Sequence, residues 1–177
     1  MPTHRHFILH KPYGYLSQFV RTETTRKNKK LLGELGDFPE GTMAIGRLDE
    51  ASEGLIFLTT DGKKSHEVRS KKVEKEYYVQ VDGNISDEAI NKLQIGVDIT
   101  IKKEKYTTLP GIAFLLKIRP DFEERAKKIR DQRHGPTSWI SITISEGKFR
   151  QVRKMTAAVG FPTLRLVRVR IGNIQLG

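Results

Sequence analysis

The chain contains no cysteine among its 177 residues. This absence excludes disulfide bonds, thiolate metal sites and a cysteine nucleophile. No apolar run approaches the roughly 18 residues needed to cross a bilayer. The N-terminal residues also lack the long apolar core of a secretory signal peptide. We therefore expect a cytoplasmic protein without a membrane partner.

Acidic residues are scarce relative to basic ones. Asp and Glu number 21 against 32 Lys and Arg, which gives a formal net charge of +11. Such an excess indicates a polyanionic partner, and nucleic acid is the first candidate. The length is enough for one domain with a substantial core, or for one domain split into two lobes.

Several motifs of well-known sites are missing. The sequence has no Walker phosphate loop and no Gly-x-Ser-x-Gly nucleophile elbow. His4, His6 and His10 lie near the N-terminus, but no carboxylate or cysteine stands at ligand spacing with them. We therefore expect no metal site.

The most informative stretch runs from residue 44 to residue 62. Its four consecutive apolar residues, 55–58, predict a strand buried on both faces. The preceding loop, Gly46-Arg47-Leu48-Asp49, brings Asp49 to the edge of that strand. A nucleophilic or basic aspartate must stay ionised, and a guanidinium such as that of Arg47 favours the ionised form. The alternative is that Asp49 caps a turn or pairs with Arg47.

Further elements follow from periodicity and capping signals. Residues 139–145 alternate between apolar and polar side chains, which predicts a strand with one buried face. Tyr77 lies on the apolar face of another predicted strand, where it could stack beneath a splayed-out base. The charged segment 118–134 predicts an insertion or an exposed helix. The other expected strands are 7–10, 75–81 and 164–171, and the expected helices are 63–70, 86–95 and 150–159, with a helical turn at 31–35.

Two stretches concentrate positive charge. Residues 21–30 contain five basic residues and one acid, which indicates either a solvated loop or a loop that contacts an RNA backbone. Residues 148–170 contain seven basic residues and no acid. The predicted helix in this stretch places Arg150, Arg153 and Lys154 off its apolar stripe. We expect the stretch to hold RNA phosphates through Lys148, Arg150, Lys154, Arg165 and Arg168.

Four motifs occur in a characteristic order. They are His10-Lys11-Pro12-Tyr13-Gly14, Gly46-Arg47-Leu48-Asp49-Glu50-Ala51-Ser52-Glu53-Gly54-Leu55, Lys75-Glu76-Tyr77 and Glu146-Gly147-Lys148-Phe149-Arg150-Gln151-Val152-Arg153-Lys154-Met155. Together they resemble the motifs of the RNA pseudouridine synthases of the small-subunit synthase A type. The resemblance covers almost the whole chain.

The resemblance implies an enzyme that isomerises uridine to pseudouridine in RNA without metal or cofactor. Asp49 would be the nucleophile or base, Tyr77 would stack on the flipped base, and Arg153 would pair with Asp49. Arg47, Lys75, Arg150 and Gln151 would also contact the substrate or support the residues that do. The implied fold is α+β: a mixed, mostly antiparallel sheet flanked by helices, with two lobes around an active-site cleft.

Several shorter stretches resemble those of family members that modify the RNA of the large ribosomal subunit, among them Ser52-Glu53-Gly54 and Thr108-Leu109-Pro110. We expect ribosomal RNA or a pre-ribosomal particle as partner and a monomer. We also expect residues 1–177 to be one catalytic domain without an N-terminal module of the ribosomal-protein S4 type. Two departures from the family pattern stand out. Phe149 occupies a position where a polar residue, often Asn, is usual, and the chain stops at Gly177, so we expect the last sheet edge to be incomplete or finished differently.

A different class of function is compatible with the same features. A non-catalytic protein that binds ribosomal RNA or assists ribosome assembly would keep the fold and the basic residues. Asp49 distinguishes the two, because a pure binding protein has no use for an ionised carboxylate beside a polyanion. A DNA-binding protein is the weaker alternative, since no helix-turn-helix pattern is present.

Overall fold

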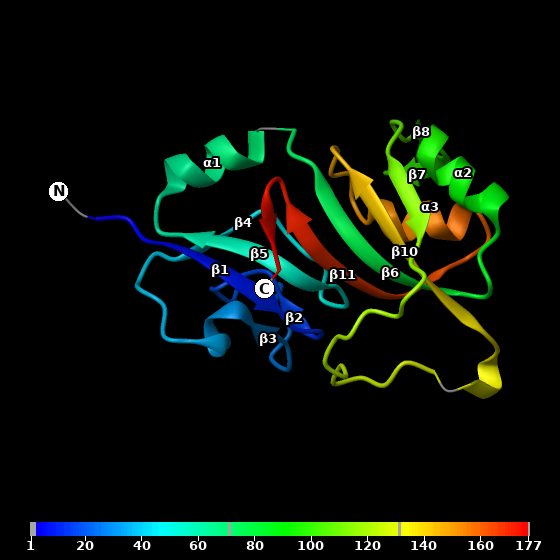
Figure 1. Cartoon of the computed structure of the whole chain (residues 1–177). Helices are drawn as coiled ribbons and strands as arrows, with labels where there is room; N and C mark the ends of the chain where they lie inside the picture. The colour runs from blue at the N-terminus through cyan, green and yellow to red at the C-terminus, as the bar shows by residue number, and fades with distance from the viewer. Residues whose placement is uncertain (1–2, 71, 131, 177) are drawn as a thin grey trace. The chain divides into compact units, whose positions relative to one another are not determined.

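Buried strands form the centre of each of the two compact units in the computed structural model (Figure 1). The structure describes residues 3–70, 72–130 and 132–176. The first unit comprises Met1–Lys72 with Leu176–Gly177, and the second comprises Val73–Gln175.

The first unit is built on β5 (Glu53–Thr59), which pairs antiparallel with β1 (His6–Lys11) and with β4 (Met43–Ile45). Leu55 and Ile56 point to opposite faces of the strand, and both are fully buried. The prediction of a strand buried on both faces is therefore confirmed. The other elements are β2 (Tyr15–Leu16), its parallel partner β3 (Lys30–Leu31), the short helix η1 (Leu32–Leu35) and α1 (Gly62–Ser70).

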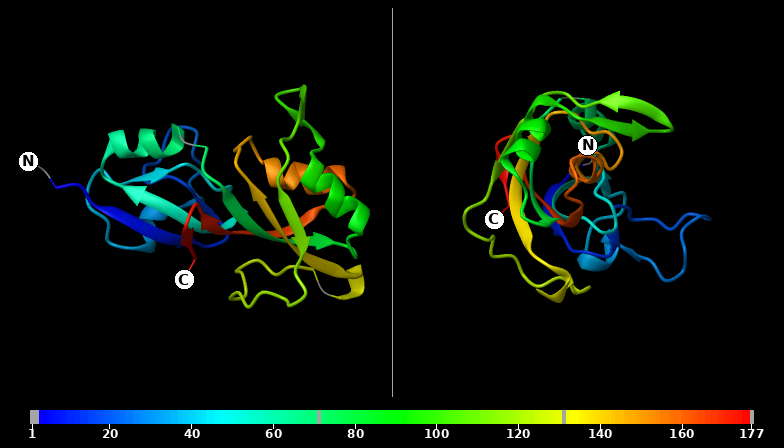
Figure 2. Two further views of the ribbon diagram at one scale, coloured as in Figure 1. Left: turned by 45° about the horizontal axis from the view of Figure 1, so that its top comes forward. Right: turned by 90° about the vertical axis from the view of Figure 1, so that its right-hand side faces the viewer.

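The second unit contains an antiparallel sheet in the order β12–β11–β6–β10–β9. Strands β7 and β8 form a separate hairpin (Figure 2). In chain order, α2 connects β6 of the sheet to β7 of this hairpin. The bounds are β6 (Lys75–Asp82), α2 (Asp87–Ile95), β7 (Asp98–Ile101), β8 (Glu104–Thr107), β9 (Ile112–Leu115), β10 (Thr137–Ile144), α3 (Gln151–Ala158), β11 (Thr163–Ile171) and β12 (Ile174–Gln175).

Helix α2 begins and ends where its capping signals predict. The Ser86 hydroxyl oxygen accepts a hydrogen bond from the Ala89 N–H at 3.2 Å, which satisfies one of the free donors of the first turn. Gly96 follows the last residue with a φ of 129°, and a Cβ there would lie 2.4 Å from the Thr108 carbonyl oxygen. Only glycine fits this position, so the sequence signal for the end of the helix has a direct steric cause.

The charged segment between β9 and β10 is extended, and the alternative of an exposed helix is wrong. Among the described residues there, only Gln132–His134 form a short helical turn, η2. Phe122 packs against Tyr78 and Trp139, with ring centroids 6.1 and 5.9 Å apart. The segment therefore lies along the sheet face that carries Tyr78, with Phe122 packed against that face.

Strand β10 is buried on both faces, so the prediction of one buried face is wrong. Ser141 and Thr143 are as buried as the isoleucines beside them. The Ser141 hydroxyl donates to the Glu76 carboxylate at 2.6 Å, which compensates for its removal from water. Polar residues on this face thus find partners on β6 instead of solvent.

The fold class is confirmed as α+β with mostly antiparallel pairing. Strand β12 follows β11 and pairs with it through Arg170–Gln175 and Ile171–Ile174. In the part of the chain that the structure describes, no helix combines the length and the apolar character that a bilayer crossing demands.

Candidate active site

A short loop between β4 and β5 carries Asp49. Gly46, with a φ of 75°, follows β4 in a backbone region that glycine favours. Leu48 is buried, Asp49 is half-buried and Arg47 is exposed. The Ser52 N–H donates to the Asp49 carbonyl at 2.9 Å. The loop is therefore anchored by Leu48 and closes into a turn around Asp49 before β5 begins.

Ser17 holds the main chain immediately before Asp49. Its hydroxyl donates to the Leu48 carbonyl at 2.6 Å and accepts from the Leu48 N–H at 3.0 Å. One side chain therefore satisfies both main-chain groups of the residue that precedes the aspartate. The sequence analysis missed Ser17, because nothing in its local pattern indicates a contact 31 positions away.

Lys11 and Gly14 hold the main chain immediately after Asp49. The fully buried Lys11 ammonium donates to the carbonyls of Pro12 (2.9 Å), Tyr15 (2.8 Å) and Glu50 (3.3 Å). The Gly14 N–H also donates to the Glu50 carbonyl at 2.8 Å. The first family motif thus forms a scaffold for the Asp49 loop. A lysine before a Pro-Tyr-Gly turn suggests an exposed residue, which is why this role was missed.

The basic loop 21–30 is organised by its own side chains. The Arg21 guanidinium donates to the carbonyls of Arg26 (2.9 Å) and Lys29 (2.5 Å). The Lys29 ammonium lies 2.9 Å from the Glu50 carboxylate, so the loop is tied to the residue that follows Asp49. Arg26 and Lys27 remain exposed. The loop is therefore a shaped cationic surface next to the Asp49 loop within the same unit.

In the second unit, three sequence-predicted residues lie on one face of the sheet. Tyr77 on β6 is directly opposite Arg168 on β11, and Lys75 lies two residues before Tyr77 on the same face. A bulge between Arg168 and Arg170 turns Arg170 to the other face, where it contacts Glu76 at 3.2 Å. Without this bulge, strict alternation would place Arg170 on the same face as Tyr77, opposite Lys75.

Lys75 is held where a charged group is disfavoured. Burial, and after it the nearby positive charge of Arg168, lowers the pKa of Lys75 below its ordinary value of 10.5. Its ammonium lies next to the segment that connects β10 to α3, since a Cβ on Gly147 would be 3.4 Å from Lys75 Nζ. The Lys75-Glu76-Tyr77 motif and the fourth motif therefore meet in the fold.

Glu146 organises the connection between β10 and α3. Its carboxylate accepts hydrogen bonds from the Leu109 N–H (2.9 Å), the Gln151 amide (2.6 Å) and the Tyr106 hydroxyl. The bond to Glu146 raises the pKa of Tyr106. Gln151 is buried, and its amide oxygen accepts from the Lys148 N–H at 3.2 Å. Glu146 was missed as a positioning residue, although a lone acid beside a basic stretch is a usable signal.

The predicted site residues fall into two groups. Asp49 and Arg47 belong to the first unit, whereas Lys75, Tyr77 and the residues of the fourth motif belong to the second. Arg153 is half-buried on α3, which begins at Gln151, one residue later than predicted. Arg150 precedes the helix with a φ of 50° and is exposed, as is Lys148. No group of metal-ligating side chains occurs among the residues that the structure describes.

Two residues predicted to contact RNA are engaged inside the second unit. Arg165 is buried, donates to the Glu123 carbonyl at 2.7 Å and lies 5.5 Å from the Phe122 ring. It fastens the charged segment to the sheet face opposite Tyr77. Gln151 fastens the Glu146–Arg150 connection in the same way. Both positions favour a structural role over a phosphate contact.

Comparisons with known proteins match both units. A family model described as RNA pseudouridylate synthase matches residues 5–158. Ribosomal large subunit pseudouridine synthase E from Xanthomonas axonopodis pv. citri is 42% identical over 171 residues, which cover 96% of this chain and 86% of the relative. The protein of the same name from Vibrio parahaemolyticus is also 42% identical, over 96% of this chain and 68% of its own length.

More distant relatives and a solved structure extend the comparison. Ribosomal large subunit pseudouridine synthase B from Yersinia pestis is 33% identical over 136 residues, which cover 76% of this chain and 37% of the relative. A crystal structure of a pseudouridylate synthase superimposes with a TM-score of 0.74 at 26% identity. That match covers 100% of this chain and 66% of the solved one.

Proposed function

The chain belongs to the RNA pseudouridylate synthase family, and from this premise we propose that it converts uridine to pseudouridine in the ribosomal RNA of the large subunit. Two relatives named ribosomal large subunit pseudouridine synthase E, each 42% identical over most of the chain, support the choice of substrate. We further assign the chain to the small-subunit synthase A type, on the strength of the four ordered motifs.

The proposed reaction rearranges one nucleotide. The bond between N1 of uracil and C1′ of ribose breaks, the base turns, and C1′ forms a bond to C5. The hydrogen at C5 leaves as a proton and N1 gains one, so the atoms balance without an oxidant, a reductant or a second substrate. The protein has to supply a reactive carboxylate, a proton acceptor for C5 and a site that holds the extruded base.

Asp49 is the carboxylate in this proposal. Attack on C1′, removal of the 2′ proton and addition to C6 all require an ionised carboxylate in a fixed position. The observation that carries the proposal is the support of the Asp49 loop on both sides. Ser17 fixes Leu48 before the aspartate, and Lys11 with Gly14 fixes Glu50 after it. Such support is what positioning for catalysis requires.

The second unit supplies the remaining groups. Tyr77 stacks on the extruded uracil and takes part in deprotonation at C5, while Lys75, Arg153 and Arg168 provide positive charge for the reacting nucleotide. Arg47, Lys148, Arg150 and Lys154 bind phosphates. Extruding a base from its stack costs on the order of a few kcal/mol. Phosphate contacts from these cations offset that cost, which makes binding dependent on salt.

The test is the release of tritium from ribosomal RNA that carries uridine labelled at C5. Formation of the new C1′–C5 bond must expel that hydrogen, so the native protein should release tritium and Asp49→Asn should not. RNA binding by Asp49→Asn should stay within a few-fold of the native value. The substrate is offered both as free large-subunit RNA and as pre-ribosomal particles.

Asp37→Asn is the matched control, because it removes an exposed carboxylate from the same unit. It should leave tritium release unchanged. Near-native release by Asp49→Asn would disprove the role of Asp49. No release by the native protein from either substrate would leave a non-catalytic RNA-binding protein as the better description.

A further inference from the structure

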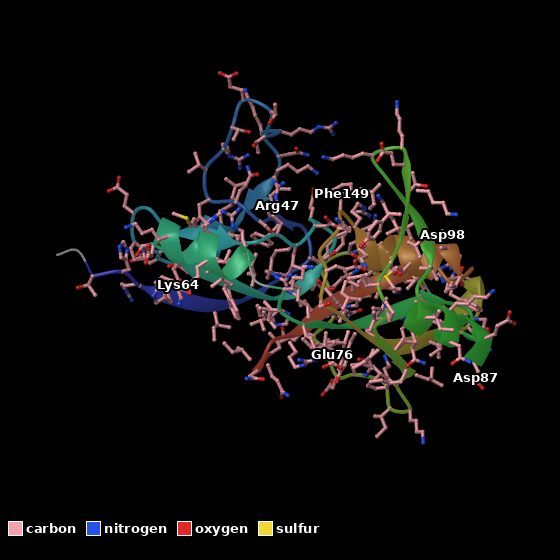
Figure 3. All side chains as sticks on the ribbon, turned by 90° about the horizontal axis from the view of Figure 1, so that it is seen from above. Arg47, Lys64, Glu76, Asp87, Asp98 and Phe149 are labelled. Atoms are coloured by element: carbon pink, nitrogen blue, oxygen red, sulfur yellow. The ribbon has the colours of Figure 1, made fainter. Side chains whose placement is uncertain are left out.

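Phe149 is a large apolar side chain displayed at the surface of the second unit. It is 66% exposed, and it lies in the connection between β10 and α3 (Figure 3). A single exposed apolar residue is common and needs no explanation by itself. The structural support and the charges around Phe149 distinguish it from an incidental exposed residue.

The connection that carries Phe149 is fixed at both ends. Before Phe149, Glu146 accepts hydrogen bonds from the Leu109 N–H and the Gln151 amide. Gln151 also accepts from the Lys148 N–H, directly before Phe149. After Phe149, the backbone of Arg150 adopts a φ of 50°, in a region that residues other than glycine seldom occupy. The ring is therefore presented from a main chain that has little freedom to fold it away.

One cationic group lies against the Phe149 ring, and others lie nearby in the sequence. The Lys154 ammonium lies 5.2 Å from the Phe149 ring centroid and donates to the Thr100 carbonyl of β7 at 2.8 Å. The Lys148 ammonium lies 5.0 Å from the ring of Tyr106 on β8. The connection thus lies along the β7–β8 hairpin. Arg150 is exposed beside Phe149.

The tip of the hairpin adds two more lysines. Lys102 and Lys103 form its two-residue turn with φ values of 49° and 67°, and both are exposed. Asn and Gly adopt this backbone at much lower cost than lysine does. The chain accordingly displays positive charge at a position where local stability favours other residues.

An exposed aromatic ring among ammonium and guanidinium groups has the chemistry of a single-strand RNA surface. Unpaired bases stack on aromatic side chains, and neighbouring lysines and arginines neutralise the phosphates. A protein partner would instead call for an apolar patch, whereas the residues flanking Phe149 on both sides, Lys148 and Arg150, are cationic.

We propose that Phe149 is a stacking platform for an unpaired nucleobase of the RNA, with Lys148, Arg150 and Lys154 on the adjoining phosphates. The proposal rests on the proposed function only in taking RNA as the ligand. It assigns a role to the residue that departs from the family pattern at this position. The base concerned is distinct from the reacting uracil, which is assigned to Tyr77.

The experiment measures binding of a fluorescently labelled single-stranded RNA oligonucleotide of mixed sequence to the full chain. Phe149→Ala should weaken binding by about 5- to 100-fold, the range that loss of one stacked base produces. Phe149→Leu should not restore it, since leucine is apolar but has no ring face. Phe149→Trp should bind as well as the native protein, and its emission should be quenched when RNA is added.

Phe114→Ala is the matched control, because Phe114 is an exposed phenylalanine of the same unit on β9. It should bind RNA with native affinity. Native affinity of Phe149→Ala, or Phe149→Trp emission that RNA does not change, would overturn the proposal. Unchanged thermal unfolding of Phe149→Ala verifies that a loss of binding is not a loss of fold.

Tritium release measured with the same variants distinguishes a failure of the stacking proposal from a failure of the proposed enzymatic function. If the native protein releases no tritium but the binding pattern at Phe149 holds, the proposed function fails and the platform stands. If tritium release is normal and Phe149→Ala binds like the native protein, the platform fails and the proposed function stands.

Discussion

Lys75 is a single residue whose position lowers the stability of the folded protein. A lysine that folding removes from water loses solvation of its charged form, and the charge of Arg168 adds repulsion. The native state therefore binds the Lys75 proton less tightly than the unfolded chain does. Lys75 is paired with Ile144 on β10 and with Ile171 on β11, and these neighbours would accept an apolar side chain at lower cost.

We expect Lys75→Met to raise the thermal unfolding temperature at pH 7 while it abolishes or strongly reduces tritium release. Between the lowered native pKa of Lys75 and 10.5, the unfolded chain binds more protons than the native protein. The stability of the native protein relative to Lys75→Met should therefore rise with pH across that window. Denaturant unfolding of both proteins at several pH values measures this difference.

Lys128→Met, at an exposed lysine of the same unit, is the control and should not raise the unfolding temperature. A stability difference between the native protein and Lys75→Met that stays flat up to pH 10.5 would contradict the cause assigned to the shift.

At the scale of the element, the Asp49 loop takes its shape from its neighbours. The Leu48 N–H and carbonyl both bond to Ser17, a residue 31 positions earlier in the chain. Removing the hydroxyl leaves a donor and an acceptor without this partner, at a cost of about 1–3 kcal/mol. The same removal frees the main chain beside Asp49.

We expect Ser17→Ala to lower kcat by about 10- to 100-fold, because a carboxylate misplaced by a fraction of an ångström loses its alignment with the substrate. KM should change little, since Ser17 is assigned no RNA contact. Ser17→Thr keeps the hydroxyl and should recover most of kcat. Single-turnover tritium release provides the rates.

Ser86→Ala, in the second unit, is the control, because it should reduce the free energy of unfolding by a similar amount. It removes the hydroxyl that caps α2, which costs about 1 kcal/mol. It should leave kcat unchanged, and an equal loss of kcat in both variants would assign the effect of Ser17→Ala to general destabilisation.

Elements with strong local signals were predictable from the sequence, and those that depend on distant partners were not. Helix α2 has a serine cap before its first residue and a glycine after its last, and β5 has four consecutive apolar residues. The segment between β9 and β10 is held by the Phe122 ring and by the hydrogen bond from Arg165 to the Glu123 carbonyl, both of which join residues far apart in the sequence, so its composition wrongly suggested an exposed helix. The β7–β8 hairpin has Lys-Lys where a turn signal would be Asn-Gly.

The same distinction holds for the candidate site. The positions of Asp49, Tyr77 and Lys75 follow from a loop before a buried strand and from strand alternation. The supporting contacts of Ser17, Lys11 and Glu146 join residues far apart in the sequence and have no local pattern. The bulge between Arg168 and Arg170 also could not be predicted, because the alternation of apolar and polar residues in the sequence gives no sign of it.

For the whole molecule, the positive charge is unevenly distributed along the chain. Residues 21–30 carry five basic residues and one acidic residue, and residues 148–170 carry seven basic residues and no acidic one, which makes twelve basic residues against one acid. Residues 119–134 carry six basic residues but also four acids. Phosphate binding should therefore come from the first two stretches, while the balanced third stretch packs along its sheet through Phe122.

We expect RNA affinity to fall steeply with salt, because each phosphate that a cation neutralises releases counterions. Lys27→Gln, in the basic loop, should reduce the slope of log K against log salt by about 0.7, the contribution of one phosphate of a single strand. Lys127→Gln removes an equally exposed charge from the balanced stretch and should leave the slope unchanged. Fluorescence titrations at several salt concentrations give the slopes. Equal reductions in both variants would mean that net charge alone governs binding, and that the basic loop has no special place in it.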